Sequence, residues 1–282
     1  MAKRTKKTNS NTSVKLSKHK KLDVTIYKKT STGTKLIPTY KIQNGPGFAS
    51  VDFNLDKDQT ILANAGMMSY MDADIKVKTQ THGFFKGLMR GLLTTSSMFL
   101  TDYTGVKGGN RISFANFLPG DVVPIIVKPG EKFTLASYGL VCMTANVILE
   151  TRMRLKGLLL GENAFLTDVK VDSTKSNQPG MVWVAAYGGY EKLDVSLGDS
   201  LQVDNGMFLA AHSDTRWKIS KIGGVKSFLF SGEGVTMKFE GPCTVYIQTR
   251  NINAFTEFIS KIAETVSGKG KGLGGVLGKA FD

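Results

Sequence analysis

The chain has 282 residues, of which 41% are hydrophobic and 21% charged, a balance typical of a soluble globular protein that builds its core without disulfides or metal. It contains no run of about 18 apolar residues, which argues against a transmembrane helix, and its N-terminus lacks the apolar segment of a secretory signal. Its two cysteines form no CxxC motif and its three histidines are scattered, so the common zinc motifs are excluded. We therefore expect an intracellular, non-secreted protein in a reducing compartment, with no cofactor.

Most of the positive charge lies at the N-terminus. Residues 1–29 hold ten basic residues and one acid, a net +9 out of +14 for the whole chain. The low apolar content of this tail predicts disorder. Three roles are open: a solubilising arm, a binding segment for nucleic acid or acidic lipid, or a mitochondrial presequence that is rich in lysine rather than arginine. The residues expected to contact a polyanion are Lys3, Arg4, Lys6, Lys7, Lys15, Lys18, Lys20 and Lys21.

Three similar segments follow the tail, each built around a glycine. They span residues 49–74, 123–146 and 191–214. Each begins with alternating apolar residues, continues through a polar turn and a second β-rich stretch, and then reaches its glycine. Period-two alternation bounded by Gly, Asp and Pro predicts strand–turn–strand units. The glycines, expected to have a positive φ, a bulge or a close backbone approach, are Gly66, Gly139 and Gly206.

A second block follows each of these segments and leads into a closing strand at 110–117, 180–187 or 243–250. In two of the blocks a turn places Glu162 and Glu233 at equivalent positions. A carboxylate that recurs in a repeat is interpreted as a structural hydrogen-bond acceptor rather than as a catalytic group. Each repeat of roughly seventy residues is expected to form a small antiparallel sandwich or barrel.

The C-terminal region contains the one strong helix signal, because Phe255, Phe258, Ile259, Ile262 and Val266 recur at helical spacing. The helix is expected to pack on the body or on a neighbouring subunit, with a membrane surface as the alternative. The sequence thus predicts an all-β chain with a short C-terminal helix. Its parts are a basic tail and lead-in at 1–37, β repeats at 38–118, 119–188 and 189–252, the helix at 253–267 and a Gly/Lys-rich flexible tail at 268–282.

Enzyme motifs are weak throughout the chain. His212 stands beside Ser213 and Asp214, but neighbouring residues on a strand point to opposite faces and do not make a triad. Lys221 is the other polar residue considered for a catalytic cleft between repeats. The glycine-rich stretch at 268–275 lacks the spacing of a phosphate-binding loop. We expect no catalytic or metal-binding residues.

Several stretches resemble one known family. They are "ANAGMMSYMDADIKVKTQ" (63–80), "NFLPGDVVPIIVKPGEKFTLASYGLV" (116–141), "LGDSLQVDNGMFLAA" (197–211) and "SGEGVTMKFEGPCTVYIQTRN" (231–251). Over residues 38–252 the chain is similar to the altered inheritance of mitochondria protein 24 family. It departs from the family pattern at Thr95-Ser96, where Gly-Glu is usual, and at Cys243, where glycine is usual.

The resemblance implies a fold similar to the tryptophan RNA-binding attenuation protein, with three β-sandwich units per chain. It also implies trimers of ninefold pseudosymmetry and no enzymatic activity. The leading hypothesis is a self-assembling, non-enzymatic scaffold, a homotrimeric ring. The alternative is a polyanion-binding module acting through the tail, including a structural virion protein of a large DNA virus; an enzyme hidden between repeats is the third reading. A mitochondrial location and a virion both stay open.

Overall fold

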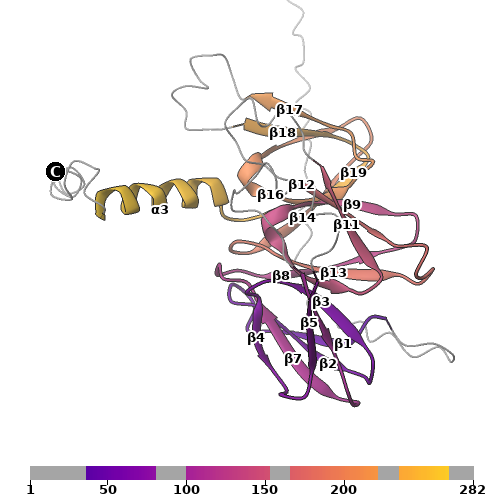
Figure 1. Cartoon of the computed structure of the whole chain (residues 1–282). Coiled ribbons are helices and arrows are strands. Elements are labelled where there is room, and N and C mark those ends of the chain that lie inside the picture. Colours follow the sequence, from indigo (N-terminus) through magenta and orange to yellow (C-terminus); the bar gives the residue numbers. More distant parts are fainter. Residues whose placement is uncertain (1–35, 81–99, 153–165, 222–234, 267–282) are drawn as a thin grey trace, which may run out of the picture.

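The computed structural model describes residues 36–80, 100–152, 166–221 and 235–266 (Figure 1). In these residues the chain forms four antiparallel sheets and one α-helix, which confirms the predicted all-β class and the C-terminal helix. The first sheet has the order β1 (Thr39–Gln43), β2 (Ser50–Leu55), β7 (Asn110–Ala115) and β4 (Met68–Met71).

Two six-stranded sheets lie between the first sheet and a fourth, three-stranded sheet. The second sheet has the order β5 (Lys76–Gln80), β6 (Leu100–Thr104), β3 (Thr60–Asn64), β10 (Leu140–Thr144), β13 (Gly180–Ala185) and β8 (Val122–Val127). The third has the order β11 (Val147–Arg152), β12 (Leu166–Val171), β9 (Lys132–Ala136), β16 (Phe208–His212), β19 (Cys243–Gln248) and β14 (Tyr190–Val195).

A three-stranded sheet and the helix complete the molecule. The sheet has the order β15 (Ser200–Asp204), β18 (Val235–Glu240) and β17 (Trp217–Lys221). Short 3₁₀ turns, η2 (Ser137–Gly139) and η3 (Asn205–Met207), precede β10 and β16, and the helix is α3 (Ile252–Val266).

One pairing order occurs three times along the chain, in unit one (β2–β7), unit two (β8–β13) and unit three (β14–β19). Within each unit the sixth strand pairs with both the first and the third, and the fifth strand pairs with both the fourth and the second. The units are joined because β3 of unit one pairs with β10 of unit two, and β9 of unit two pairs with β16 of unit three. Each six-stranded sheet is therefore shared by two consecutive units.

The predicted alternation accounts for the first strand of units one and two. Val51, Phe53 and Leu55 on β2 are at most 1% exposed. In unit three the pattern is weaker, because Leu193 is only half-buried and Leu197 follows the end of β14 with 79% of its surface exposed.

The hydrophobic cores extend across the boundaries between consecutive units. Phe53 in the core of unit one packs edge-on against Trp183 of unit two, with ring centroids 4.8 Å apart. The core of unit two likewise takes in Leu209 and Ala210 from unit three. Among the described residues, the core of unit three contains eight buried apolar residues, against seventeen in each of the other two. Unit three lacks the layer that a following unit gives to its predecessors.

The units converge at one end, which we call the narrow rim: residues 47–49, 119–121 and 186–189. There the Ala49 amide donates to the Gly120 carbonyl at 2.7 Å, and the Asp121 amide donates to the Gly188 carbonyl at 2.8 Å. Face-to-face sheets lie about 10 Å apart, whereas hydrogen-bonded backbones lie about 4.8 Å apart. Successive units are therefore wedge-shaped, with the narrow rim as the thin edge.

A glycine makes this convergence possible. A Cβ at Gly120 would lie 1.7 Å from the carbonyl oxygen of Ala186. We expect Gly120→Ala to force the rim apart and to lower the free energy of unfolding by about 1–3 kcal/mol, measured by urea denaturation. Gly108→Ala is the control, because a Cβ at Gly108 would meet nothing within 4 Å. Equal unfolding midpoints for the two variants would contradict this account of the rim.

Candidate functional site: the two open edges

Each joint between consecutive units is formed by the third strand of one unit and the second strand of the unit before it. Among the described strands, the third strand of unit one and the second strand of unit three have no such partner. β4 of unit one pairs with β7, and β15 of unit three pairs with β18. Their counterparts β10, β16, β3 and β9 all have neighbours on both sides. Within the described part of the chain, β4 and β15 therefore each present one open edge with a row of backbone donors and acceptors. The outer strands β1, β5, β8, β11, β14 and β17 also have an open edge, but β4 and β15 differ from them because their counterparts pair with a strand of another unit.

The register of the two internal joints is the same. Cys142 lies opposite Ala63 in one, and Ala210 lies opposite Leu135 in the other. A bulge at the start of the third strand, between Met68 and Tyr70 in β4, recurs at the corresponding place in β10 and β16. Carrying this register to the open edges would place Tyr70 opposite Val203, Met71 opposite Gln202 and Asp72 opposite Leu201.

Burial at equivalent positions identifies β4 as an uncovered surface. Met68, Leu140 and Phe208 begin the third strand of their units, and they are 40%, 1% and 2% exposed. Tyr70 is 49% exposed, whereas Cys142 and Ala210 at the same position are fully buried. Cys142 belongs to the core of unit one and Ala210 to the core of unit two, so at this position the preceding unit provides the cover that Tyr70 lacks.

The opposite edge shows the complementary deficit. Val203 on β15 belongs to the small core of unit three, and the half-buried Leu193 occupies the position of Phe53 in unit one and Ile125 in unit two. Those two counterparts are at most 3% exposed because a following unit covers them. The surface around β15 and β14 thus has the form of a joint without its second half.

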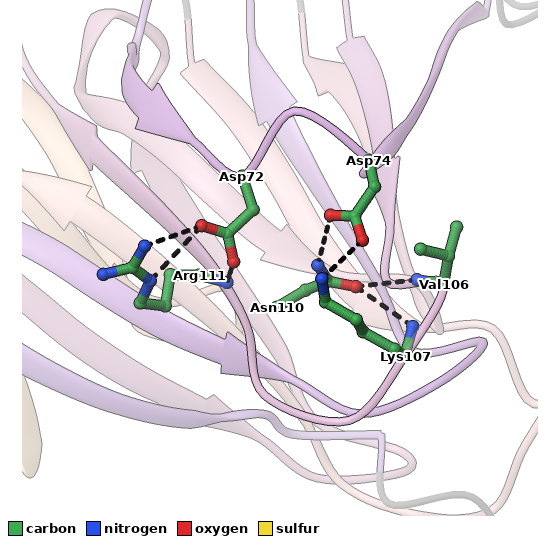
Figure 2. Close-up of polar contacts among 6 residues, drawn as sticks. All are labelled: Asp72, Asp74, Val106, Lys107, Asn110 and Arg111. Atoms are coloured by element: carbon green, nitrogen blue, oxygen red, sulfur yellow. Dashed lines mark hydrogen bonds and ion pairs between the residues drawn. The ribbon is translucent and has the colours of Figure 1, made fainter.

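A network of charged side chains fixes the loop that leaves β4 (Figure 2). The carboxylate of Asp72 accepts from the Arg111 backbone amide at 2.8 Å and from its guanidinium at 2.9 Å. Asp74 accepts from the side-chain amide of the buried Asn110 at 2.7 Å and pairs with Lys107 at 2.8 Å. The hydrogen bonds from Arg111 lower the pKa of Asp72, and the one from Lys107 lowers the pKa of Asp74. The end of β4 is therefore held in place although β7 is its one neighbouring strand among the residues that the structure describes.

The outer face of the first sheet is polar, unlike the corresponding face of unit two. Ser113 donates to Asp52 at 2.6 Å, and the side-chain amide of Gln43 donates to the same carboxylate. Burial, followed by the nearby Asp52 charge, raises the pKa of Tyr70. Ser113 occupies the position of Trp183 in unit two. A joint formed on this face would be more polar than the joints inside the chain.

A second polar cluster lies where units two and three meet. Asp168, only 1% exposed, accepts from Thr134 at 2.7 Å and from Ser213 at 3.3 Å. Lys132 pairs with Glu150 at 2.8 Å, and Glu150 also pairs with Lys170 at 2.5 Å. Hydrogen bonds from these lysines lower the pKa of Glu150. The cluster connects β9 and β12 to the end of β16, and its chemistry is that of a structural clamp.

The residues considered for catalysis do not form a nucleophile–base pair. His212 Nδ1 lies 3.8 Å from Asp214, and its ring packs on Phe133 with centroids 4.1 Å apart. The Ser213 hydroxyl instead contacts Asp168 and Thr134. The Lys221 side chain lies outside the described residues. In the described ranges, no group of three or more His, Cys, Asp or Glu is arranged to hold a metal ion.

The three repeat glycines have different roles. Gly66 has a φ of 82°, whereas Gly139 and Gly206 lie outside the left-handed region and are close to their neighbours. A Cβ at Gly139 would lie 2.9 Å from Val184, and one at Gly206 would lie 2.1 Å from Asn251. Gly66 and Gly206 stand two residues before the third strand and Gly139 stands one before it, so the three are not strictly equivalent.

Other predicted residues lie outside the described ranges. These are the tail residues from Lys3 to Lys21 and the turn residues Glu162 and Glu233. Sequence reasoning missed Met68, Tyr70 and Val203, although comparing the apolar character of the three third strands could have drawn attention to the first two. Within the described helix, no segment is long and apolar enough to cross a membrane.

Comparisons with known proteins agree with this fold. The model of the family described as "Mitochondrial biogenesis AIM24" matches residues 40–250. The chain belongs to this family. An uncharacterised protein of Streptococcus pyogenes serotype M6 is 23% identical over 238 residues, which cover 81% of this chain and 92% of the relative.

The crystal structure of a Streptococcus pyogenes protein has a fold similar to that of this chain. The two superpose with a TM-score of 0.63 at 19% identity, over 79% of this chain and 98% of the other. At this identity the likeness shows the fold alone. Membership of the AIM24 family, expected from the sequence, is confirmed.

The Glu150 cluster leads to a pH-dependent prediction. Because the folded pKa of Glu150 is lowered, its pairing stabilises the fold fully above the ordinary carboxyl pKa and is lost as the pH falls through the lowered value. Glu150→Gln should therefore lower the urea midpoint at about pH 7, and the difference from the unaltered chain should shrink progressively as the pH falls below the ordinary carboxyl pKa. Glu240→Gln, which removes a more exposed pair with Lys218, is the control and should have a smaller effect at neutral pH. A midpoint difference that does not change with pH would contradict the role given to Glu150.

Proposed function

We propose that this protein is a non-enzymatic scaffold that assembles through the open edges of β4 and β15 into a closed homotrimeric ring. One observation carries the proposal: β4 is the exposed counterpart of two buried third strands, and β15 is the counterpart of the two second strands to which they pair. One chain thus ends in two complementary halves of the same joint. Pairing β15 of one chain with β4 of the next would continue the order of strands already present inside the chain.

Such contacts are head-to-tail, and head-to-tail contacts produce either rings or open filaments. The wedge shape of the units favours a ring, because each joint turns the stack in the same sense toward the narrow rim. Three chains per ring, nine units in all, is the number that the family resemblance implies. Assembly would cover both open edges and supply the missing layer of the third core.

The proposal gives a residue-level test. Met71 and Gln202 should face each other across the chain–chain joint at a Cα separation of about 4.5–5.5 Å, within the range that a disulfide can span. In a Cys243→Ala background, the double variant Met71→Cys/Gln202→Cys should oxidise to covalent trimers. The measurement is a non-reducing gel alongside the mass from light scattering after size-exclusion chromatography.

The matched control is Met71→Cys/Ser200→Cys, which shifts the second cysteine by two residues along the same strand. The Cβ atoms of residues 71 and 200 would lie about 7–8 Å or more apart, so this pair should not cross-link. A monomeric mass, or equal cross-linking of the two pairs, would refute assembly through this register. A three-chain mass with selective cross-linking of the first pair would support it.

A second function is favoured by the charge distribution. The tail carries a net +9 in residues 1–29, and a three-chain ring would present three copies of it, which strengthens weak polyanion contacts through avidity. The surface it would bind is nucleic acid or acidic lipid. The family description suggests a mitochondrial setting, and a virion protein remains the other setting for such a tail.

Deleting residues 1–22 tests this second function. The full chain should bind single-stranded DNA or phosphatidylglycerol vesicles with an affinity that falls steeply with salt, since each neutralised phosphate releases counterions. The shortened chain should lose most of this affinity and most of the salt dependence while keeping the mass of the assembly. Unchanged binding after the deletion would exclude the tail as the binding segment.

A further inference from the structure

The helix α3 begins at the narrow rim, beside the open edge of unit three. The Asn251 side-chain oxygen caps it by accepting from the Ala254 amide at 3.1 Å, and its amide donates to Asp204 at the end of β15 at 2.8 Å. Phe255 in the first turn packs against Tyr187 of the rim, with ring centroids 5.1 Å apart. Beyond this turn the helix projects away from the sheets (Figure 1).

The projecting part of α3 has an uncovered apolar face. Phe258, Ile259 and Ile262 are 59%, 46% and 42% exposed. They continue along the helix from Phe255, which is half-buried against the rim. A helix with an apolar stripe of this kind is stable in water only when something covers the stripe.

The spacing of the stripe indicates what covers it. Ile252, Phe255, Ile259, Ile262 and Val266 follow one another at alternating steps of three and four residues, which makes them the a and d positions of a heptad repeat. The a positions are Ile252, Ile259 and Val266, and the d positions are Phe255 and Ile262. Because Phe255 packs on Tyr187, the layers left to meet a partner lie in the projecting part, where the a and d positions are Ile259, Ile262 and Val266. β-branched residues at both a and d favour three or more strands over two.

The charged residues avoid this seam. Glu257 pairs with Lys261 at 2.7 Å, and these two residues occupy the outward f and c positions. Glu264 also occupies an f position. The flanking e and g positions hold Thr256, Phe258, Ala263 and Thr265, so no like charges would oppose each other across a bundle.

From these observations we infer that the α3 helices of three chains associate through this stripe as a short parallel three-helix coiled coil on the axis of the ring. The inference rests on the proposed ring, which would place three copies of α3 at equivalent positions along the narrow rim. Threefold symmetry makes the helices parallel. The helix has 15 residues, about two heptads, too few for a stable free coiled coil. Tethering to the ring raises the effective concentration of its partners and overcomes that limit.

The charge of the polar face favours this occupant over a membrane. Helices that lie on membranes usually carry lysine and arginine on the polar face. The described helix has two acidic residues and one basic residue, Glu257, Glu264 and Lys261, a net charge of −1. Attraction to anionic lipid headgroups would therefore be weak, whereas the same face suits the solvent side of a bundle.

Cysteine cross-linking of the full-length chain in a Cys243→Ala background tests the inference. Ile259→Cys places a thiol in an a layer, and Lys261→Cys, two residues away, places one on the outer face. Oxidation should link two of the three chains of each ring through Cys at 259, with a yield that does not change when the protein is diluted. The Lys261→Cys variant should remain largely uncross-linked. Ile262→Cys, in the adjacent d layer, should behave like Ile259→Cys and guards against a local effect of one substitution.

Light scattering on the same samples separates this inference from the ring itself. A three-chain mass with equal cross-linking at 259 and 261 would overturn the bundle and leave the ring standing, whereas a monomeric mass would remove the ring and the bundle with it. Sedimentation with phosphatidylglycerol/phosphatidylcholine vesicles that is abolished by Ile259→Asp/Ile262→Asp would show that the stripe faces lipid, and would also overturn the bundle. Selective cross-linking at 259 and 262 in a three-chain particle is the supporting result.

Discussion

Strand pairing between consecutive units is the interaction on which the rest of this structure depends. Because β3 pairs with β10 and β9 pairs with β16, no unit has a sandwich of its own. The cores of units one and two are completed by side chains from the unit that follows, as Trp183 completes the core around Phe53. The exposure of Met68 and Tyr70 at one end of the chain and the small third core at the other have the same cause. In a chain built in this way, the first unit lacks a preceding neighbour and the last unit lacks a following one.

Side-chain periodicity was enough to predict the class of the fold and several of its strands. Val51, Phe53 and Leu55 alternate as a half-buried strand should, and the apolar spacing from Phe255 onward located α3. Periodicity cannot show which strand lies beside which, because pairing partners such as Ala63 and Cys142 are far apart in sequence. Aligning the sequence on its glycines also set Gly139 against Gly66, although Gly139 lies one residue before its strand and Gly66 lies two before, so the glycines gave a register that is wrong by one residue in unit two.

The candidate site was harder to predict than the fold. Its defining property is a difference between equivalent positions, such as Tyr70 against Cys142, and the difference has meaning only once the neighbours of each strand are known. Likewise, the clamp around Asp168 joins residues of β9, β12 and the end of β16, and no local pattern connects them. The tail, by contrast, was evident from composition alone, because its role as a polyanion-binding candidate rests on charge rather than on contacts.

The polar outer face of the first sheet bears on how such a particle would come apart. In the proposed ring, two of every three joints would be internal to a chain, and the joint between units one and two is sealed by apolar side chains such as Trp183. The third would present Asp52 and Tyr70, groups that water solvates well once the chains are separated. Breakage and subunit exchange would thus be confined to three predetermined seams, while the arcs between them leave and return intact. The ring would be repaired and remodelled one whole chain at a time.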